Sequence, residues 1–202
     1  KENSKEIVYV SSGEGTTSQG DFHEALNWAS NAKAPVIFHI QDNEYAISTH
    51  KSEQTAGSVY NMTAGYKNLS RYDVDGTDFF ETNLAFRQAV DRARKGKGPS
   101  VIISNVVRLL PHSSSDDQRK YRTEEALDED KKRDPIKVLE DHCIREKFIS
   151  SNEFKKIRDK VTSQIDEDAQ WAEEQSYPEP STALDHIYSS DIINDEADYE
   201  SI

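Results

Sequence analysis

Short runs rich in Val and Ile alternate with helical segments through the first half of the chain. Three such runs predict strands at residues 6–11, 35–40 and 100–107, the first two of them buried, and residues 70–74 are predicted as a further strand. Helices are predicted between them, at residues 22–32 and 78–95. Strands that alternate with helices across short turns are typical of an α/β fold with a parallel sheet. The runs show no alternation of apolar and polar residues, so helices are expected on both faces of the sheet.

The second half of the chain has a different character. Residues 1–110 carry 12 Lys/Arg and 13 Asp/Glu, whereas residues 111–202 carry 13 and 25. Helices are predicted at 134–147 and 151–175, and the sequence YPEP ends the second one. The expected organisation is an α/β core at 1–110, a His- and Ser-rich loop at 111–125, a helical region at 126–180 and an acidic tail or linker at 181–202.

Composition excludes several classes of function. Nucleic-acid binding needs clustered Lys and Arg, which an acidic surface does not offer. No apolar run approaches the roughly 18 residues that a membrane span requires. Cys143 is the one cysteine, so no intrachain disulfide can form, which fits a reducing compartment.

Polar residues follow the first two predicted strands at the point where each ends. The turn Gly13-Glu14-Gly15 follows the first strand, and Asn43 follows the second. In a parallel sheet both loops lie at the carboxyl edge, where ligands bind. A carboxylate, an amide oxygen and a backbone carbonyl are the hard oxygen ligands that Mg²⁺ prefers, with a diphosphate and water supplying the rest. Glycines also let backbone N–H groups approach phosphates.

These residues resemble a known cofactor motif. Gly13-Glu14-Gly15 with Asn43 is similar to the thiamine-diphosphate motif, in which an Asn follows a GDG sequence. The segments GEGTTSQGDFHEALNWA, PVIFHIQDNEYAIST and RLLPHSSSDDQRKYR resemble the α subunit, or the α half of a fused chain, of thiamine-diphosphate-dependent 2-oxo acid dehydrogenase E1 components. The resemblance is to the branched-chain (2-oxoisovalerate) type and covers residues 7–188. It implies the C-terminal part of a thiamine-diphosphate-binding fold.

The resemblance implies a role for each residue of the motif. Glu14 and Asn43 would be side-chain ligands of Mg²⁺, and Tyr45 would supply its backbone carbonyl. The residues implied to bind the cofactor are Gly13, Glu14, Gly15, Thr16, Asn43, Tyr45, Ile47, Arg108 and His112. His112 is also implied to be catalytic, because the family's histidine assists intermediates during acyl transfer.

The implied activity is oxidative decarboxylation of a branched-chain 2-oxo acid, with acyl transfer to a lipoyl group. The implied partners are the E1 β subunit or a fused β half, and the lipoyl domain and core of the acyltransferase E2, in an α₂β₂-type assembly. The implied location is the bacterial cytoplasm or the mitochondrial matrix. Ser113 matches a serine that is phosphorylated in animal relatives, where phosphate would add about two negative charges beside an anionic cofactor.

Three positions depart from the family pattern. Gln41 stands where animal relatives have Arg, Glu44 replaces a common Gly, and Pro111 replaces a second His. The loss of the Arg removes a fixed positive charge near the phosphates, and the loss of the Gly affects the turn after Asn43. These changes bear on the finer contacts rather than on the identity of the cofactor.

Other interpretations of the same residues stay open. Glu14 could be a turn residue or an anion at a helix N-terminus, and His112 and Ser113 could belong to an ordinary polar loop. The chain could come from a pyruvate or acetoin dehydrogenase, or act as a catalytically silent assembly module for the β half and E2. A nucleotide-binding domain is disfavoured, because the sequence lacks a G-x-x-x-x-G-K-[ST] loop and a dinucleotide glycine pattern.

Overall fold

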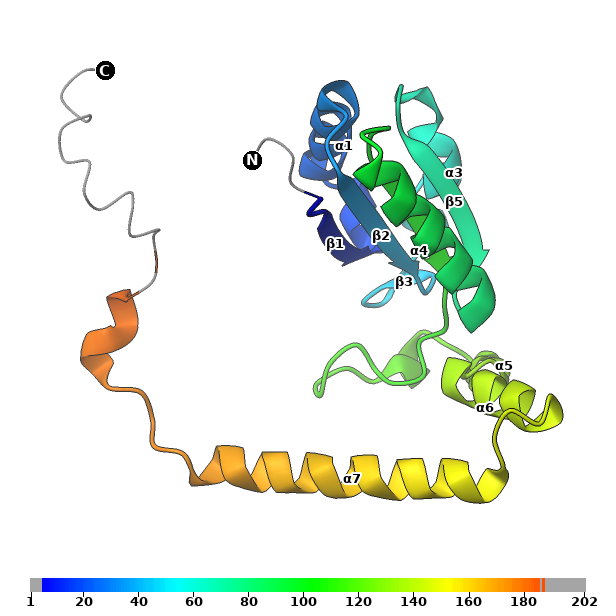
Figure 1. The fold of residues 1–202 in the computed structure, drawn as a ribbon, viewed down its shortest axis with the longest axis vertical. Helices are drawn as coiled ribbons and strands as arrows, with labels where there is room; N and C mark the ends of the chain where they lie inside the picture. Colours follow the sequence, from blue (N-terminus) through cyan, green and yellow to red (C-terminus); the bar gives the residue numbers. More distant parts are fainter. Residues whose placement is uncertain (1–4, 186, 188–202) are drawn as a thin grey trace. The chain divides into compact units, whose positions relative to one another are not determined.

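The computed structural model describes residues 5–185 and residue 187 (Figure 1). The chain divides into two compact units, Lys1–Ser150 and Ser151–Ile202. The first contains the sheet and the second contains one long helix. Most of the acidic tail expected at 181–202 lies outside the described residues.

The first unit is built on a four-stranded parallel sheet with the strand order β1-β2-β6-β5. Its strands are Val8–Gly13 (β1), Val36–Asp42 (β2), Ser70–Asp75 (β5) and Ser100–Asn105 (β6). Strand β6 lies between β2 and β5, so Ser100 is in register with both Ile37 and Ser70. The predicted α/β class with a parallel sheet is confirmed.

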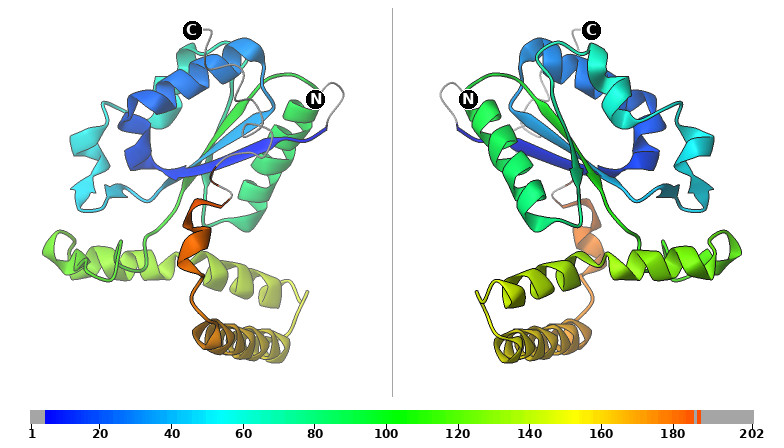
Figure 2. Two further views of the ribbon diagram at one scale, coloured as in Figure 1. Left: turned by 90° about the vertical axis from the view of Figure 1, so that its left-hand side faces the viewer. Right: turned by 90° about the vertical axis from the view of Figure 1, so that its right-hand side faces the viewer.

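Helices cover the two faces of this sheet (Figure 2). Helix α1 (Gly20–Ala32) packs Phe22 and Leu26 into one core cluster with residues of β2 and β6. Helix α4 (Phe79–Arg94) packs its alanines into a second cluster with the alternate residues of the same strands. Burial on both faces explains why β2 and β6 carry apolar residues at consecutive positions, Val36–Phe38 and Val101–Ile103.

The other elements of the first unit are short. They are the 3₁₀ helices Glu14–Ser18 (η1), Thr63–Gly65 (η2) and Gln118–Lys120 (η3), the two-residue strands Tyr45–Ala46 (β3) and Thr49–His50 (β4), and the helices Lys51–Gln54 (α2), Val59–Met62 (α3), Glu124–Lys132 (α5) and Pro135–Arg145 (α6). The second unit contains Ser151–Glu174 (α7) and the 3₁₀ helix Pro180–Leu184 (η4). No helix in the described ranges is long and apolar enough to cross a bilayer.

Three expectations need correction. Strand β1 is not buried: it is the outer strand of the sheet, and Val8, Tyr9 and Val10 are 54, 52 and 41% exposed. The expected loop after β2 contains the antiparallel hairpin β3–β4. Helix α5 was not predicted, because its sequence is almost entirely polar.

Candidate functional site

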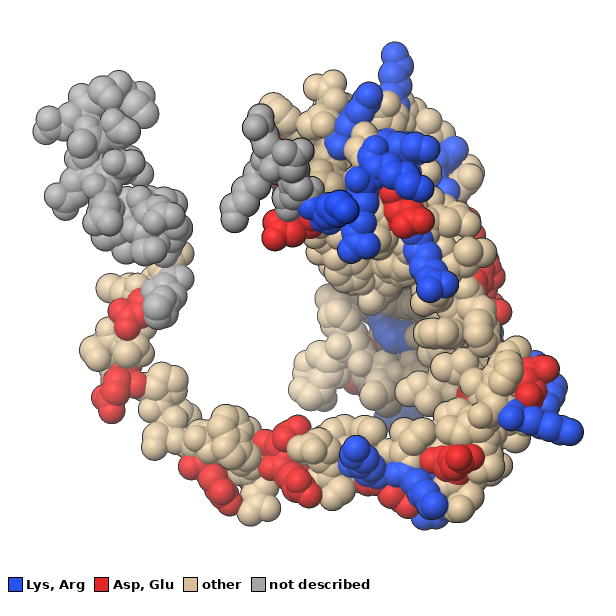
Figure 3. All heavy atoms as spheres, in the orientation of Figure 1, with Lys and Arg blue, Asp and Glu red and all other residues tan. Residues whose placement is uncertain are grey.

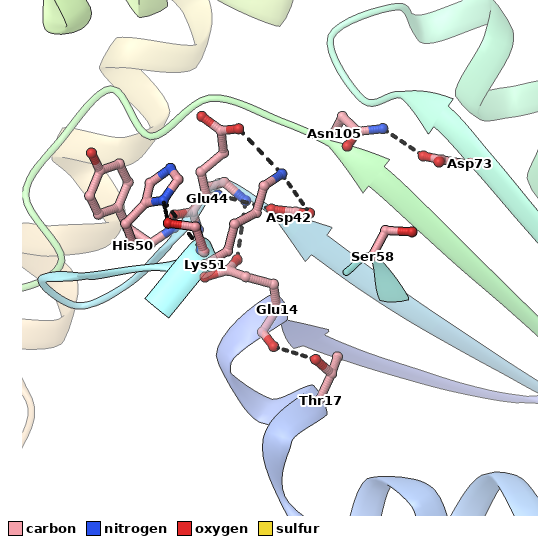
Figure 4. Close-up of polar contacts among 12 residues, drawn as sticks. Glu14, Thr17, Asp42, Glu44, His50, Lys51, Ser58, Asp73 and Asn105 are labelled. Carbon is pink, nitrogen blue, oxygen red and sulfur yellow. Dashed lines mark hydrogen bonds and ion pairs between the residues drawn. The ribbon is translucent and has the colours of Figure 1, made fainter. Parts of the chain in front are cut away.

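The ends of strands β1 and β2 bring Glu14 and Asn43 together, as the sequence predicted. The two strands are adjacent and parallel, with Gly13 in register with Gln41. Glu14 therefore begins η1 close to the end of β2, where Asp42 lies (Figure 4). The backbone N–H of Asn43 donates to Oε2 of Glu14 at 3.1 Å. The Thr17 hydroxyl donates to the Glu14 carbonyl at 2.6 Å and closes the 3₁₀ turn.

Glu14 is a buried carboxylate with no cationic partner among the described residues. It is 3% exposed, and no Lys, Arg or His in that part of the chain makes an ion pair with it. The nearby amine, Lys51, pairs instead with Asp42 at 3.1 Å and Glu44 at 3.2 Å. A buried charge is costly unless it is paired or bound to a metal. The position of Glu14 therefore fits a group that receives a cation from outside the chain.

The Asn43 side chain shapes the turn that follows β2. Its Oδ1 accepts a hydrogen bond from the Tyr45 N–H at 3.2 Å, and Asp42 Oδ1 accepts from the Glu44 N–H at 3.0 Å. Glu44 adopts φ +71°, in the left-handed region that favours Gly. The absence of Gly at this position, noted from the sequence, is thus accommodated by a left-handed Glu.

A cluster of Lys51, Asp42 and Glu44 beside Asn43 was not anticipated. Burial acts to lower the pKa of Lys51, but the hydrogen bonds and charges of Asp42 and Glu44 outweigh it and raise that pKa. The amine is therefore a fixed positive charge that holds the start of α2 against the turn. The acidic residue Asp42, directly before Asn43, is the sequence feature from which this cluster could have been predicted.

Gly15 is required by close packing against the hairpin. A Cβ at this position would lie 2.8 Å from the Ala46 Cβ, a distance that real Cβ atoms do not reach. Gln54 Nε2 donates to the Gly15 carbonyl at 2.8 Å, so α2 also holds this turn. Gly13 has no such contact, since its Cβ would meet only the Gln41 carbonyl at 4.0 Å. Thr16 is exposed beside them.

Arg108 joins the hairpin to the loop that follows β6. It donates to the Ile47 carbonyl at 2.7 Å and to the Tyr121 hydroxyl at 2.6 Å. That hydroxyl donates to Asp116 Oδ2 at 2.6 Å, and the His112 N–H donates to the same oxygen at 2.9 Å. The His112 ring is exposed and belongs to this network through its backbone. The structure thus brings Ile47, Arg108 and the backbone of the His112 segment together.

The network sets the ionisation of its members. The Tyr121 hydroxyl and then the His112 N–H hold the pKa of Asp116 below its ordinary value. Burial, followed by the hydrogen bond to Asp116, raises the pKa of Tyr121. At neutral pH the pair is therefore a phenol that donates to a carboxylate.

Arg122 links the same loop to helix α5. Its side chain is 5% exposed and pairs with Asp130 of α5, and it donates to the Arg108 carbonyl at 3.1 Å. The Arg122 guanidinium carbon also lies 5.1 Å from the centre of the Tyr45 ring. Tyr121 and Arg122 belong to the KYR sequence at 120–122, for which no role was predicted.

The other residues singled out from the sequence make few contacts with this site. Ser113 is exposed, and its hydroxyl shares a 3.2 Å hydrogen bond with Ser115. Gln41 donates to the Ser11 hydroxyl at 3.2 Å. Within the described ranges no group of three or more His, Cys, Asp or Glu side chains could hold a metal. Glu14 and Asn43 instead offer one carboxylate and one amide, a set suited to a cation that brings other oxygen ligands with it.

Comparison with known proteins gives consistent matches. Residues 1–181 match the family model described as "Dehydrogenase E1 component". The 2-oxoisovalerate dehydrogenase subunit alpha of Bacillus subtilis is 37% identical over 183 residues, which are 90% of this chain and 55% of that protein. The pyruvate dehydrogenase E1 component subunit alpha of Staphylococcus aureus is 42% identical over 135 residues, 66% of this chain and 36% of that protein.

The same subunit from Acholeplasma laidlawii is 35% identical over 163 residues, 80% of this chain and 47% of that protein. The chain thus spans about half, or less, of the length of these relatives. Among solved structures, a transketolase from Campylobacter jejuni is similar with 23% identity and a TM-score of 0.42, over 49% of this chain and 15% of that one.

Proposed function

The chain belongs to the dehydrogenase E1 component family, and from this premise we propose that it is part of the α subunit of a thiamine-diphosphate-dependent 2-oxo acid dehydrogenase. The observation that carries the proposal is the buried Glu14 carboxylate, which lies against Asn43 and has no cation partner in the described chain. This is the arrangement that a bound Mg²⁺ would complete.

In this proposal the two loops hold the cofactor through its metal and its phosphates. Glu14 and Asn43 would bind Mg²⁺ through side-chain oxygens, and Tyr45 through its carbonyl. Gly13, Gly15 and Thr16 would lie along the diphosphate, where the lack of a Cβ on Gly15 keeps the turn close to the hairpin. Ile47 would lie near the cofactor rings, and Arg108 and His112 near the diphosphate and the substrate channel. When bound, thiamine diphosphate supplies the carbon nucleophile that attacks the keto group and allows loss of CO₂.

The residues of the loop after β6 would then control access to the reacting group. Asp116 and Tyr121 hold the backbone of His112, so the imidazole is carried on a fixed segment rather than on a free loop. His112 would hold or move a proton during acyl transfer to the lipoyl group of E2. Ser113, next to it, would be the residue at which phosphorylation changes this segment.

For the substrate we propose a branched-chain 2-oxo acid of the 2-oxoisovalerate type. The HSSSDD sequence at 112–117 supports this choice, as does the Bacillus subtilis relative that matches 90% of the chain. A pyruvate dehydrogenase is the second candidate, favoured by the 42% identity of the Staphylococcus aureus subunit over a shorter stretch. On either reading the partners would be an E1 β subunit or fused β half and E2, in a bacterial cytoplasm or a mitochondrial matrix.

The test uses the complete E1 enzyme that contains this chain, with thiamine diphosphate and Mg²⁺. Reduction of an artificial electron acceptor is followed with 2-oxoisovalerate and with pyruvate, for the wild type and for Glu14→Ala. Glu24→Ala, on the exposed side of α1, is the matched control. Turnover of 2-oxoisovalerate that exceeds pyruvate, vanishes in Glu14→Ala and survives in Glu24→Ala is the expected result.

Two other outcomes would change the conclusion. A preference for pyruvate would leave the proposed cofactor unchanged and make pyruvate, rather than 2-oxoisovalerate, the substrate. If neither acid is turned over and the Glu14 variant assembles with the β subunit and E2 as the wild type does, the chain is a structural module rather than part of a catalytic subunit.

A further inference from the structure

Lys51 closes the turn that carries Asn43 through both its backbone and its side chain. Its N–H donates to the Glu44 carbonyl at 2.8 Å. Its Nζ lies 3.1 Å from Oδ2 of Asp42 and 3.2 Å from Oε1 of Glu44. Figure 4 shows the amine between these two carboxylates. Lys51 is therefore the cation of an ion-pair cluster that borders the proposed metal site.

The Asp42 carboxylate is part of the structure of this turn. Its Oδ1 accepts the Glu44 N–H at 3.0 Å, a bond that spans Asn43, and the Asp42 carbonyl accepts the Val106 N–H at 2.9 Å. The Asp42 side chain is 10% exposed, so water screens its charge poorly, whereas the Glu44 side chain is 56% exposed and is screened far better. Asp42 is thus the carboxylate whose charge acts most strongly on the neighbouring site.

The charges around the motif are mostly negative. In the described chain Lys51 is the one amine that pairs with Asp42 or Glu44, and Glu14 has no cation of its own. Arg108 reaches the same hairpin, but it donates to the Ile47 carbonyl and to a tyrosine hydroxyl. A diphosphate that binds here through a metal would add its own negative charge. Without Lys51 it would have to bind beside two uncompensated carboxylates, which is repulsive.

The basic side chains over α4 lie at the opposite edge of the sheet. On the face shown in Figure 3 they gather over this helix, and Arg92 and Arg94 belong to its last turn. Helix α4 starts after β5, at the carboxyl edge, and ends before β6 begins, at the amino edge. These arginines therefore do not offset the carboxylates beside the motif.

We propose that Lys51 is the counter-charge that allows this acidic turn to accept an anionic cofactor, and that it sets the affinity of the site for the diphosphate group. The inference rests on the proposed function, in which the diphosphate binds through a metal held by Glu14 and Asn43. Lys51 acts through the charge of Asp42 and touches no reacting atom, so it is a positioning residue rather than a catalytic one.

A purely structural role for Lys51 makes a different prediction, and Asp42→Asn separates the two. Asn keeps an oxygen that can accept the Glu44 N–H, but it removes the negative charge. If the charge of Asp42 opposes the diphosphate, this change tightens binding. If the ion pair between Lys51 and Asp42 only holds the turn in shape, its loss weakens binding, as the loss of Lys51 does.

Calorimetric titration of the complete E1 enzyme with thiamine diphosphate, at saturating Mg²⁺, tests the proposal. Lys51→Met is expected to raise the Kd by about tenfold, the effect of one unit charge at close range in a partly screened site. Asp42→Asn should lower the Kd, and the double variant, whose net charge is unchanged, should return close to the wild type. Lys67→Met, at an exposed lysine before the amino end of β5, is the matched control.

Three further measurements distinguish charge from shape. Lys51→Arg keeps the charge and should bind thiamine diphosphate almost as tightly as the wild type. The difference in Kd between Lys51→Met and the wild type should shrink as salt rises from about 50 to about 500 mM, because salt screens the uncompensated carboxylates. In steady-state assays Lys51→Met should raise the KM for thiamine diphosphate more than it lowers kcat.

Two results would overturn the inference and leave the proposed cofactor unchanged. One is an equal Kd for the wild type and Lys51→Met, and the other is weaker binding in Asp42→Asn. The second result decides the question even if Lys51→Met does not fold, because Asn retains the hydrogen bond of the turn. A wild-type enzyme that binds no thiamine diphosphate would instead refute the proposed function, and this inference with it.

Discussion

The carboxylate of Glu14 accepts a hydrogen bond from the backbone N–H of Asn43, which ties the residue after strand β1 to the residue after strand β2. The two residues are 29 positions apart in the chain. Their contact depends on the parallel pairing of the two strands, since only that pairing brings both ends to one edge. A change at either residue therefore affects both loops of the proposed metal site.

Glu14→Gln should have opposite effects on stability with and without the cofactor. Without Mg²⁺ the change removes a buried charge, keeps an acceptor for Asn43 and should raise the unfolding free energy by about 1 kcal/mol or leave it unchanged. With Mg²⁺ and thiamine diphosphate, ligand binding should stabilise the wild type much more than the variant. Thermal denaturation of the complete enzyme checks this, with Glu24→Gln as the control. Equal stabilisation of both by the cofactor would remove Glu14 from the metal site.

Gly15→Ala should destabilise the chain, and adding Ala46→Gly in the same chain should restore its stability. The new methyl group would lie 2.8 Å from the Ala46 Cβ, so overpacking is expected to cost about 1–3 kcal/mol. Removal of the Ala46 methyl makes room for it. Urea denaturation of the two single variants and the double variant measures the coupling. Strictly additive effects would mean that the two residues do not compete for the same space.

Glu44→Gly should stabilise the turn after β2, whereas Glu44→Ala should not. A residue at φ +71° is strained by roughly 1 kcal/mol unless it is Gly. The ion pair with Lys51 is partly exposed, so its loss costs less than that. Ala removes the ion pair and keeps the strain, which makes it the matched control. The order Gly above wild type above Ala in urea midpoints is expected, and Ala at or above Gly would contradict it.

Tyr121→Phe should loosen the segment that carries His112. The change removes the hydroxyl that links Arg108 to Asp116, and Asp116 is the acceptor for the His112 N–H. Hydrogen exchange at the His112 amide is expected to accelerate in Tyr121→Phe and in Asp116→Asn. Asp117→Asn is the control, because Asp117 bonds to Arg119 instead. If exchange is unchanged in both test variants, the network does not order this loop.

His39 should make the first unit less stable in mild acid. Burial lowers the pKa of His39 below its ordinary value of 6.5. As the pH falls through about 6.5, the unfolded chain takes up a proton that the folded chain refuses, so stability declines by up to about 1.4 kcal/mol per pH unit. His39→Gln can keep hydrogen bonds to Tyr9 and Ser104 without titrating. Unfolding free energies between pH 5 and 7.5 should slope less in the variant, and equal slopes would exclude His39 as the cause.

The elements that were predicted correctly are those with a local signal. The strands at β2, β5 and β6 and the helices α1, α4, α6 and α7 follow from apolar runs, helical periodicity and the turn residues between them. The helix predicted at 78–95 is α4, whose N-cap Asp78 accepts from two of its backbone N–H groups. The contact between Glu14 and Asn43 was predicted from the rule that the carboxyl ends of parallel strands lie at the same edge of the sheet. Each of these conclusions depends on residues that are close in the chain or on one strand pairing.

The elements and contacts that were not predicted have different causes. The β1 sequence has the same apolar character as β6, and only the strand order decides that β1 lies at the edge. The network of Arg108, Tyr121 and Asp116 lies in the irregular loop after β6 and reaches the hairpin only through the Ile47 carbonyl, so no periodic spacing in the sequence reveals it. Helix α5 could have been found from Thr123, whose hydroxyl accepts from the Ala126 N–H as an N-cap.

The central place of β6 also governs the order in which the protein can form as it is synthesised. Ser100 pairs with Ile37 and with Ser70, so until the ribosome has made β6, β2 has only β1 beside it and β5 has no strand beside it. At ordinary synthesis rates the interval from the end of β2 to the start of β6 lasts on the order of 3–12 s. During that interval the β1–β2 pair and, once it is made, β5 lack the central strand that joins them into one sheet. A nascent chain that stalls before residue 105 is therefore a natural client for chaperones.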